Sequence, residues 1–294
     1  MLHGVFTALS TPFATDGQID FNALEHLLTA QLAAGVHGVV LLGTTAETPT
    51  LSSQEKKQIL DFCVPRLTGK CQIIIGTGSN HTATTVENTR MALSYKPDAV
   101  LVVTPYYNKP NPAGLIAHYQ QIAALGAPIV LYHIPGRTGL KLSSALLAQL
   151  LQEVPQIVGV KESDYDPSHV MDTAVKYAGK LAYLCGNDDL FPQYLAINAA
   201  GIISAAANVF APAFVQIYNL FKQGKTTDSF AVFSQLYPLI KACYAETNPT
   251  CIKYMLAKRG FGTEKVRLPL GEIADTNKTH IEALLQTANP TWMI

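Results

Sequence analysis

Eight short runs of apolar, often β-branched residues recur along the chain, and each is followed by a longer stretch of mixed character. Within a run the apolar residues are continuous instead of alternating with polar ones. Continuous apolar character is typical of parallel strands that helices cover on both faces. The runs that we predict as strands are 4–9, 38–42, 72–75, 99–103, 129–132, 157–160, 181–184 and 201–203.

The stretches between these runs repeat apolar residues at the spacing of an α-helix. Leu24, Leu27 and Leu28 fall on one face of the first predicted helix. Ser52 and Glu55 have the spacing of a capping box at the start of the second. The chain therefore alternates strands with helices from its first residues.

The number of these units predicts the fold. Eight strands and eight helices, ending near Gly224, indicate a closed (β/α)8 TIM barrel. An open doubly wound sheet is the alternative, but it would expose edge strands in a very apolar set. After Gly224 the predicted strands stop, and residues such as Phe230 and Phe233 repeat at helical spacing. We predict a catalytic barrel at residues 1–224 and a C-terminal helical region at 225–294.

The composition argues against several classes of protein. Lys plus Arg and Asp plus Glu each number 21, so no charge excess indicates a nucleic-acid or membrane partner. No run approaches the roughly 20 apolar residues of a membrane span, and the N-terminal residues lack a signal-peptide pattern. The five cysteines contain no C-x-x-C pair, so we expect reduced thiols in a cytoplasmic protein.

Candidate chemistry lies where the strands end, because barrel active sites form at the carboxyl ends of the strands. Lys161 directly follows the apolar run 157–160. Burial disfavours the ammonium form of a lysine, and the neutral amine is the form that attacks a carbonyl. A lysine that reaches solvent, or that pairs with Glu47 or Glu162, is the alternative interpretation.

Other polar residues at strand ends carry similar alternatives. Tyr132 could move protons at a carbinolamine, or be a core tyrosine with its hydroxyl at the rim. Thr44 and Thr45 could bind a carboxylate, or simply end a strand. Arg137 follows a Pro-Gly turn and could clamp a carboxylate, or be a solvated surface arginine.

Three other kinds of site find no support in the sequence. The segment 76–81 lacks the third glycine of a dinucleotide-binding loop. The eight histidines are scattered without the spacing of a helical metal site. No serine lies in a glycine-flanked nucleophile elbow. We therefore expect no nicotinamide cofactor, no metal and no serine nucleophile.

Taken together, these strand-end residues resemble the dihydrodipicolinate synthase family, within the superfamily that also contains N-acetylneuraminate lyases. The resemblance extends from Gly4 to about Pro269. Any one of its motifs alone would be weak, but their combination is specific. The motifs are Gly43-Thr44-Thr45-Ala46-Glu47, Thr104-Pro105-Tyr106-Tyr107-Asn108, Tyr132 through Gly139, Gly159-Val160-Lys161-Glu162 and Gly201-Ile202-Ile203-Ser204.

The resemblance implies a pyruvate Schiff base on Lys161, without a bound cofactor. It implies a proton relay of Thr44, Tyr132 and Tyr107, in which Tyr107 reaches across a dimer interface into the neighbouring subunit's site. Thr45 would hold the pyruvate carboxylate.

The resemblance also assigns the second substrate. Arg137 would receive the carboxylate of L-aspartate 4-semialdehyde, Gly186 would leave space for the substrate, and the Ile203 carbonyl would lie against the nucleophile. The product would be 4-hydroxy-tetrahydrodipicolinate, of lysine and diaminopimelate biosynthesis. A homotetramer built as a dimer of dimers is implied as well.

Two residues depart from the family pattern. Ala46 stands where a glycine is usual, which is tolerable only with a negative φ. Asn187 stands where many members carry an acidic residue. Both leave the Schiff-base residues intact, so they bear on substrate preference.

Inhibition by L-lysine is expected to be weak or absent. Sensitive relatives typically place histidine at the position of Lys56 and glutamate at that of Thr84, whereas Asn80 and Tyr106 match the sensitive pattern. Thr84 offers the ligand's ammonium only a neutral hydroxyl. Glu87, three residues further along the predicted helix, could substitute for the missing anion.

Two other functions remain open from the sequence. One is a sialic-acid lyase or a 2-keto-3-deoxy sugar-acid aldolase of the same superfamily, although Arg137 suits a short carboxylate-bearing aldehyde better than a polyol. The other is a catalytically silent barrel that binds a keto acid as a sensor. Such a barrel would be expected to have lost a member of the relay, and all of them are present.

Overall fold

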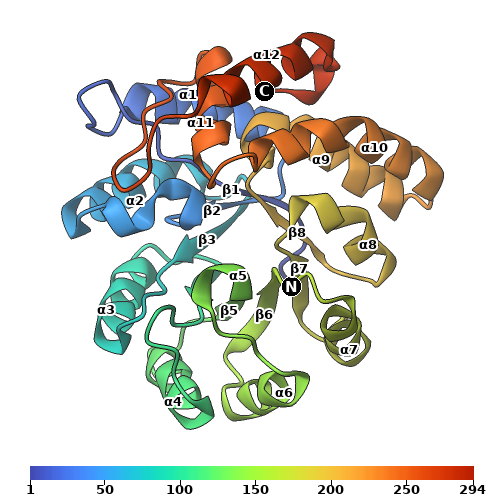
Figure 1. Ribbon diagram of the computed structural model, residues 1–294. Coiled ribbons are helices and arrows are strands. Elements are labelled where there is room, and N and C mark those ends of the chain that lie inside the picture. The colour runs from blue at the N-terminus through green and yellow to red at the C-terminus, as the bar shows by residue number, and fades with distance from the viewer. The chain divides into compact units, whose positions relative to one another are not determined.

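The computed structural model describes all residues from 1 to 294, and its eight strands close into a parallel barrel in the order of the chain, β1 to β8 (Figure 1). The predicted (β/α)8 barrel is thereby confirmed. The strands are β1 (Gly4–Ala8), β2 (Gly38–Leu41), β3 (Gln72–Gly76), β4 (Ala99–Val103), β5 (Ile129–His133), β6 (Ile157–Glu162), β7 (Ala182–Cys185) and β8 (Gly201–Ser204).

Every predicted strand is present, and no boundary differs from the prediction by more than two residues. The largest extension is at β6, which continues through Lys161 and Glu162. Lys161 is therefore a strand residue whose backbone is held in the sheet. Strand β8 also extends by one residue, to Ser204.

The chain divides into two compact units, which are described separately. The middle unit comprises residues 1–3 and 72–203. Parallel pairing in it runs in order from β3 to β8. Its helices are α3 (Thr82–Leu93), α4 (Pro112–Ala123), α5 (Pro135–Thr138), α6 (Ser144–Glu153), α7 (Pro167–Tyr177) and α8 (Phe191–Ala196), with the 3-10 turn η3 (Asp188–Leu190).

The terminal unit comprises residues 4–71 and 204–294. It contains the parallel pair β1 and β2. Its helices are α1 (Phe21–Ala33), α2 (Ser53–Leu67), α9 (Ala207–Lys222), α10 (Thr226–Cys243), α11 (Thr250–Lys258) and α12 (Asp275–Thr287), with the 3-10 turns η1 (Thr44–Ala46), η2 (Thr48–Thr50) and η4 (Pro290–Trp292).

The capping chemistry expected from the sequence is present. Ser52 and Glu55 form both hydrogen bonds of a capping box at the start of α2. Leu24, Leu27 and Leu28 are buried on one face of α1. The local sequence therefore determines where α2 starts and which face of α1 is buried, as the periodicity indicated.

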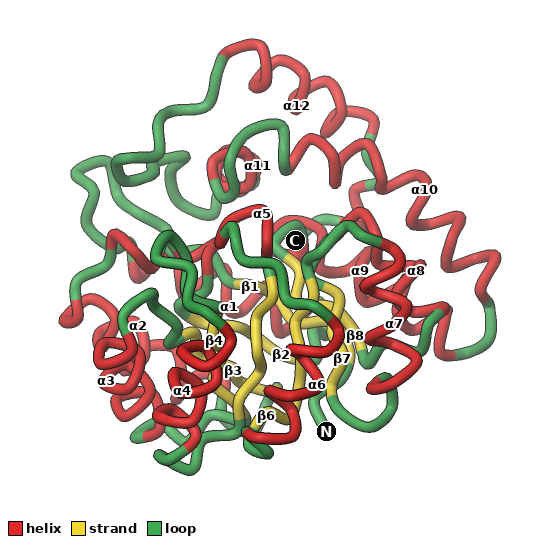
Figure 2. The backbone as a smooth tube through the Cα atoms, turned by 60° about the horizontal axis from the view of Figure 1, so that its bottom comes forward, coloured by secondary structure: helices red, strands yellow, loops and turns green.

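The C-terminal helical region is confirmed as strand-free. In Figure 2 the terminal unit from α9 to α12 is coloured as helices and loops only. Helix α10 packs on α9 and α12 packs on α10. A domain boundary at residue 224 stays a prediction, because the compact unit that contains these helices also contains β1, β2 and α9.

Two further features concern the chain as a whole. None of its helices combines the length and apolar character that crossing a membrane would require. No disulfide joins any of its five cysteines.

Candidate active site

The ends of β5 and β6 hold Tyr132 and Lys161 side by side. The two residues are direct cross-strand partners in the parallel register. Each is only 6% exposed, and the Lys161 Nζ lies 4.1 Å from the centroid of the Tyr132 ring. The register of two neighbouring strands thus brings a buried amine and a phenol together, as the sequence predicted.

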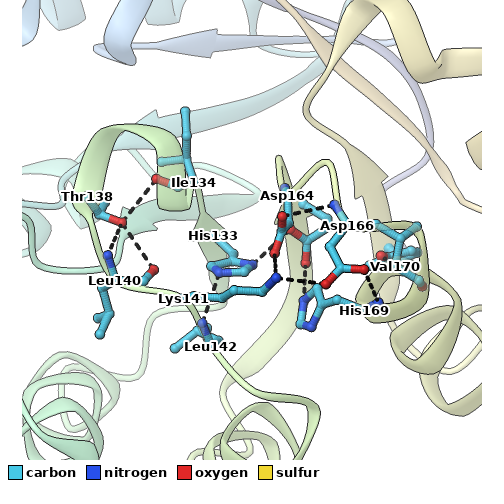
Figure 3. A network of polar contacts seen from close by, with 12 residues as sticks. His133, Ile134, Thr138, Leu140, Lys141, Leu142, Asp164, Asp166, His169 and Val170 are labelled. Atoms are coloured by element: carbon cyan, nitrogen blue, oxygen red, sulfur yellow. Dashed lines mark hydrogen bonds and ion pairs between the residues drawn. The ribbon is translucent and has the colours of Figure 1, made fainter.

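Glu162 points away from this pair, because successive side chains of a strand face opposite sides of the sheet. Its Oε1 lies 2.8 Å from His133 Nδ1 and accepts the Asp164 backbone N–H at 2.8 Å. Its Oε2 lies 3.1 Å from His169 Nε2, on α7. Figure 3 labels His133 and His169, which belong to two different elements, β5 and α7.

These contacts fix the charge of Glu162. Burial alone would raise the pKa of its carboxyl, but the hydrogen bonds from His133 and His169 outweigh burial and lower the pKa to about 2. Glu162 is therefore an anion whose oxygens already bind other donors. The alternative in which Lys161 pairs with Glu162 is not what the structure adopts.

His133 is held in one tautomer by its neighbours. The Leu142 backbone N–H donates to His133 Nε2 at 3.0 Å, so this nitrogen carries no proton. His133 Nδ1 must then carry the proton that it donates to Glu162. The hydrogen bond to Glu162 also raises the pKa of His169 above its ordinary value.

The ligating atoms of His133, Glu162 and His169 lie within 4.8 Å of one another, a grouping that could hold a metal ion. Sequence reasoning missed this cluster, since its members come from three separate elements with no helical spacing. The direct hydrogen bonds account for the arrangement without an ion, because each nitrogen that faces the carboxylate is placed to donate to it.

Arg137 lies on the short α5 turn and its side chain is exposed. Thr138 Oγ1 donates to the Ile134 carbonyl at 3.0 Å and accepts the Leu140 N–H at 3.2 Å. Gly139 ends the turn with a φ of 64°. The turn is thus fixed by its own hydrogen bonds.

Tyr107 behaves unlike the other candidate residues. It is 88% exposed and has a φ of 69°, which is rare for a tyrosine. Its neighbour Asn108 donates from Nδ2 to the Asn80 carbonyl at 2.8 Å, which anchors this loop. The middle unit therefore holds Tyr107 outward, away from the buried pair.

Gly186 and Ile203 lie at the ends of β7 and β8. The Gly186 N–H donates to the Glu162 carbonyl at 2.7 Å. A Cβ at Gly186 would collide with Ser163 Oγ and lie 2.8 Å from that carbonyl oxygen. Close backbone approach to β6 is thus enough to require glycine there. Ile203 is buried within β8.

Thr44 and Thr45 belong to the terminal unit and form the η1 turn after β2. Thr45 is buried, and its Oγ1 accepts a hydrogen bond of 3.0 Å from Asn248 Nδ2. The positive φ in this motif falls on Glu47, at 55°, and Ala46 is not among the residues with positive φ. The condition for tolerating Ala46 is therefore met.

Glu47 is engaged within the terminal unit. Its carboxylate is buried and forms an ion pair with Lys253, and it also accepts the Arg267 backbone N–H at 2.8 Å. Pairing with Lys161 is therefore not its role. Sequence reasoning missed Asn248, Lys253 and Arg267, because nothing local in the last 50 residues relates them to this turn.

A buried amine beside a phenol at the strand ends of a (β/α)8 barrel lies where enzymes of this fold have their active sites. The chain matches the model of the dihydrodipicolinate synthetase family over residues 1–288, and it belongs to that family.

Individual relatives agree with this assignment. The 4-hydroxy-tetrahydrodipicolinate synthase of Brachyspira hyodysenteriae is 36% identical over 286 residues, covering 97% of each chain. That of Methanocaldococcus jannaschii is 36% identical over 287 residues, covering 97% of this chain and 98% of its own.

Among solved structures, the 4-hydroxy-tetrahydrodipicolinate synthase from Methylacidiphilum fumariolicum SolV has a TM-score of 0.94 at 34% identity. The match covers 97% of this chain and 95% of that one. The comparisons give no support to a sugar-acid aldolase.

Proposed function

We propose that this enzyme condenses pyruvate with L-aspartate 4-semialdehyde to form 4-hydroxy-tetrahydrodipicolinate, through a Schiff base on Lys161. The observation that carries the proposal is the buried Lys161 beside Tyr132 in a chain of this family. The similar proteins are named for the same product.

The chemistry begins at the Lys161 nitrogen, which attacks the keto carbon of pyruvate to give a carbinolamine. Loss of water leaves an iminium, and removal of a proton from the adjacent methyl group leaves an enamine that attacks the aldehyde. The amino group of the semialdehyde then attacks the iminium carbon and displaces the Lys161 amine, which closes the ring and frees the enzyme. Tyr132 supplies and removes protons at the carbinolamine. Its ring contact with Lys161 supports this role.

The remaining relay members are Thr44 and Tyr107, with Tyr107 acting in the site of a neighbouring subunit. The outward position of Tyr107 and its unusual φ support a role at an interface. We propose a homotetramer built as a dimer of dimers. A monomeric dihydrodipicolinate synthase variant is itself a structural neighbour, with a TM-score of 0.93.

The other binding roles follow the family motifs. Thr45 holds the pyruvate carboxylate, and the Ile203 carbonyl lies against the nucleophile. Gly186 leaves room for the substrate. Arg137, on its fixed turn, receives the carboxylate of the semialdehyde through charge-assisted hydrogen bonds. We further propose a cytoplasmic enzyme that uses no bound cofactor and no nucleic-acid or membrane partner.

Reductive trapping tests the function directly. Borohydride added with pyruvate should leave an adduct on Lys161, located by peptide mass spectrometry, and Lys161→Arg should abolish it because guanidinium stays protonated. Lys253 is the informative internal control, since burial lowers the pKa of this second buried lysine to about 8. An adduct on Lys253, or none, would refute the assignment.

The substrate roles are separable by variants. Arg137→Ala should weaken use of the semialdehyde about tenfold to hundredfold while leaving adduct formation with pyruvate intact, since a charged hydrogen bond is worth about 1.5–3 kcal/mol. Tyr107→Phe should lower turnover without dissociating the oligomer. A folded, fully active monomer would contradict the shared site.

L-Lysine is proposed to inhibit weakly or not at all. Thr84 offers a hydroxyl that lies 2.9 Å from His81 Nδ1, and not an anion. Strong inhibition by sub-millimolar L-lysine would contradict this, and Glu87, which is exposed on α3, would then be the residue to mutate.

A further inference from the structure

The turn after β2 has a backbone that needs outside support. Two 3-10 turns, η1 and η2, meet at Glu47, which has a φ of 55°. A side chain in this left-handed region is strained, and the conformation persists only where the surroundings impose it. The contacts of the Glu47 side chain provide such support.

The Glu47 carboxylate is bound by residues from the end of the chain. Its Oε1 pairs with the Lys253 ammonium, and its Oε2 accepts the Arg267 N–H at 2.8 Å. Lys253 is buried, also donates to the Lys265 carbonyl at 2.8 Å, and lies 3.8 Å from the centroid of the Phe13 ring. Each oxygen of the Glu47 carboxylate is therefore bound by a different segment, one around residue 253 and one around residue 267.

Thr45, two residues earlier, receives a contact of a different kind. Asn248 Nδ2 donates to Thr45 Oγ1 at 3.0 Å, across 203 residues of sequence. A hydroxyl has one proton to donate and lone pairs to accept with. With its oxygen accepting from an amide, the hydroxyl is left with its proton to offer to another acceptor. A carboxylate is such an acceptor.

We propose that Asn248 is a positioning residue for the keto acid: it sets the Thr45 hydroxyl as a donor to the pyruvate carboxylate, while Lys253 and Arg267 hold the Glu47 turn that carries Thr45. The inference rests on the proposed function and deepens it. It gives the C-terminal region a part in substrate binding in addition to its packing on α9.

The decisive variants change what Asn248 offers to Thr45. Asn248→Asp presents only acceptor oxygens and draws the Thr45 proton to itself, so the pyruvate concentration for half-maximal adduct formation should rise about tenfold to hundredfold. Asn248→Ala leaves the hydroxyl free to rotate, and the rise should be smaller, about threefold to tenfold. If Asn248 served only in packing, Asn248→Asp would not be expected to weaken pyruvate binding more than Asn248→Ala.

A double-mutant cycle separates positioning from general damage. In a Thr45→Val background the Asn248 substitutions should have no further effect on pyruvate saturation, because the hydroxyl that they act on is gone. Asn277→Ala is the matched control, because this asparagine of α12 donates its amide to Glu246 at 2.7 Å instead. It should leave pyruvate saturation unchanged.

The outcomes distinguish the two levels of the proposal. If the wild-type enzyme forms no trapped adduct with pyruvate, the proposed function fails. If it does, and both Asn248 variants saturate with pyruvate within twofold of wild type, only the role of Asn248 fails. Should Asn248→Asp not fold, Asn248→Ala in the wild-type and Thr45→Val backgrounds decides: equal effects in both overturn the proposal.

Discussion

Two buried glutamates, Glu47 in the turns after β2 and Glu162 at the end of β6, are held in different ways. Glu162 is bound by His133 of β5 and His169 of α7, which lie 29 and 7 residues away. Glu47 is bound by Lys253 and Arg267, 206 and 220 residues away at the end of the chain. One carboxylate is stabilised by local elements, the other by a distant region.

The partners also differ in charge. Neutral His133 donates one hydrogen bond to Glu162, so no permanent cation faces that carboxylate from β5. Glu47 faces Lys253, an ammonium at neutral pH because its pKa of about 8 lies above that value. Removing a partner should therefore cost more at Glu47, where it leaves a buried charge uncompensated.

The largest effect is expected from Lys253→Met. Breaking a buried ion pair by removing one partner typically costs about 3–5 kcal/mol, because the remaining charge stays buried. Denaturant unfolding measures this loss. The matched control is the double variant Glu47→Gln/Lys253→Met, which removes both charges and should recover part of the stability. If Lys253→Met lowers the free energy of unfolding by less than about 1 kcal/mol, the range of exposed pairs, then losing a partner is not more costly at Glu47 than at Glu162.

Acid should reveal the other glutamate. The pKa of Glu162 is lowered from 4.5 to about 2, so its contribution is complete above pH 4.5 and is lost as the pH falls towards 2. By the linkage relation the loss is about 3 kcal/mol. The raised pKa of His169 acts in the opposite direction, adding stability at low pH that is lost as the pH rises above 6.5.

Melting temperature against pH tests both limbs of this dependence. Glu162→Gln should flatten the limb between pH 4.5 and 2, whereas Lys253→Met should leave it in place. An unchanged acid limb in Glu162→Gln would mean that another carboxylate dominates acid unfolding.

At neutral pH, Glu162→Gln is expected to cost about 1.5–3 kcal/mol, the range for a hydrogen bond to a charged group. The amide keeps an acceptor for one histidine but turns a donor towards the other. Denaturant unfolding at pH 7 gives the comparison with Lys253→Met. A larger loss than in Lys253→Met would reverse the order of the two networks.

The smallest effect is expected at the rim of the same network, where Lys141 pairs with Asp166 at 2.8 Å and with Asp164 at 3.3 Å (Figure 3). Lys141 is 53% exposed, and an exposed ion pair contributes little to stability because water screens its charges. Lys141→Ala should therefore change the unfolding free energy only slightly, and less in high salt. If Lys141→Ala lowered the free energy of unfolding as much as Glu162→Gln does, the exposed ion pairs of Lys141 would be energetically coupled to the buried Glu162 network.

The pattern of apolar residues was sufficient for the strands, because continuous runs and helical periods are local properties. It also placed Lys161 and Tyr132 correctly, since in-register strand ends bring their residues together. It could not place Asn248 or Lys253. Their partners are set by how the last helices pack, and no local spacing encodes that. His133 and His169 were missed because they belong to separate elements, β5 and α7, and no regular spacing in the sequence relates them to Glu162.

The origin of the Glu47 contacts also sets an order of events in synthesis. The residues that grip the turn after β2 are made about 200 residues later than the turn itself. At about 5–20 residues per second, a ribosome needs roughly 10 to 40 s to reach them. Throughout that interval the nascent chain carries an acidic turn without its cation. Thr45 therefore takes its final place only when almost the whole polypeptide has been translated, so fragments released early should not gain the complete turn.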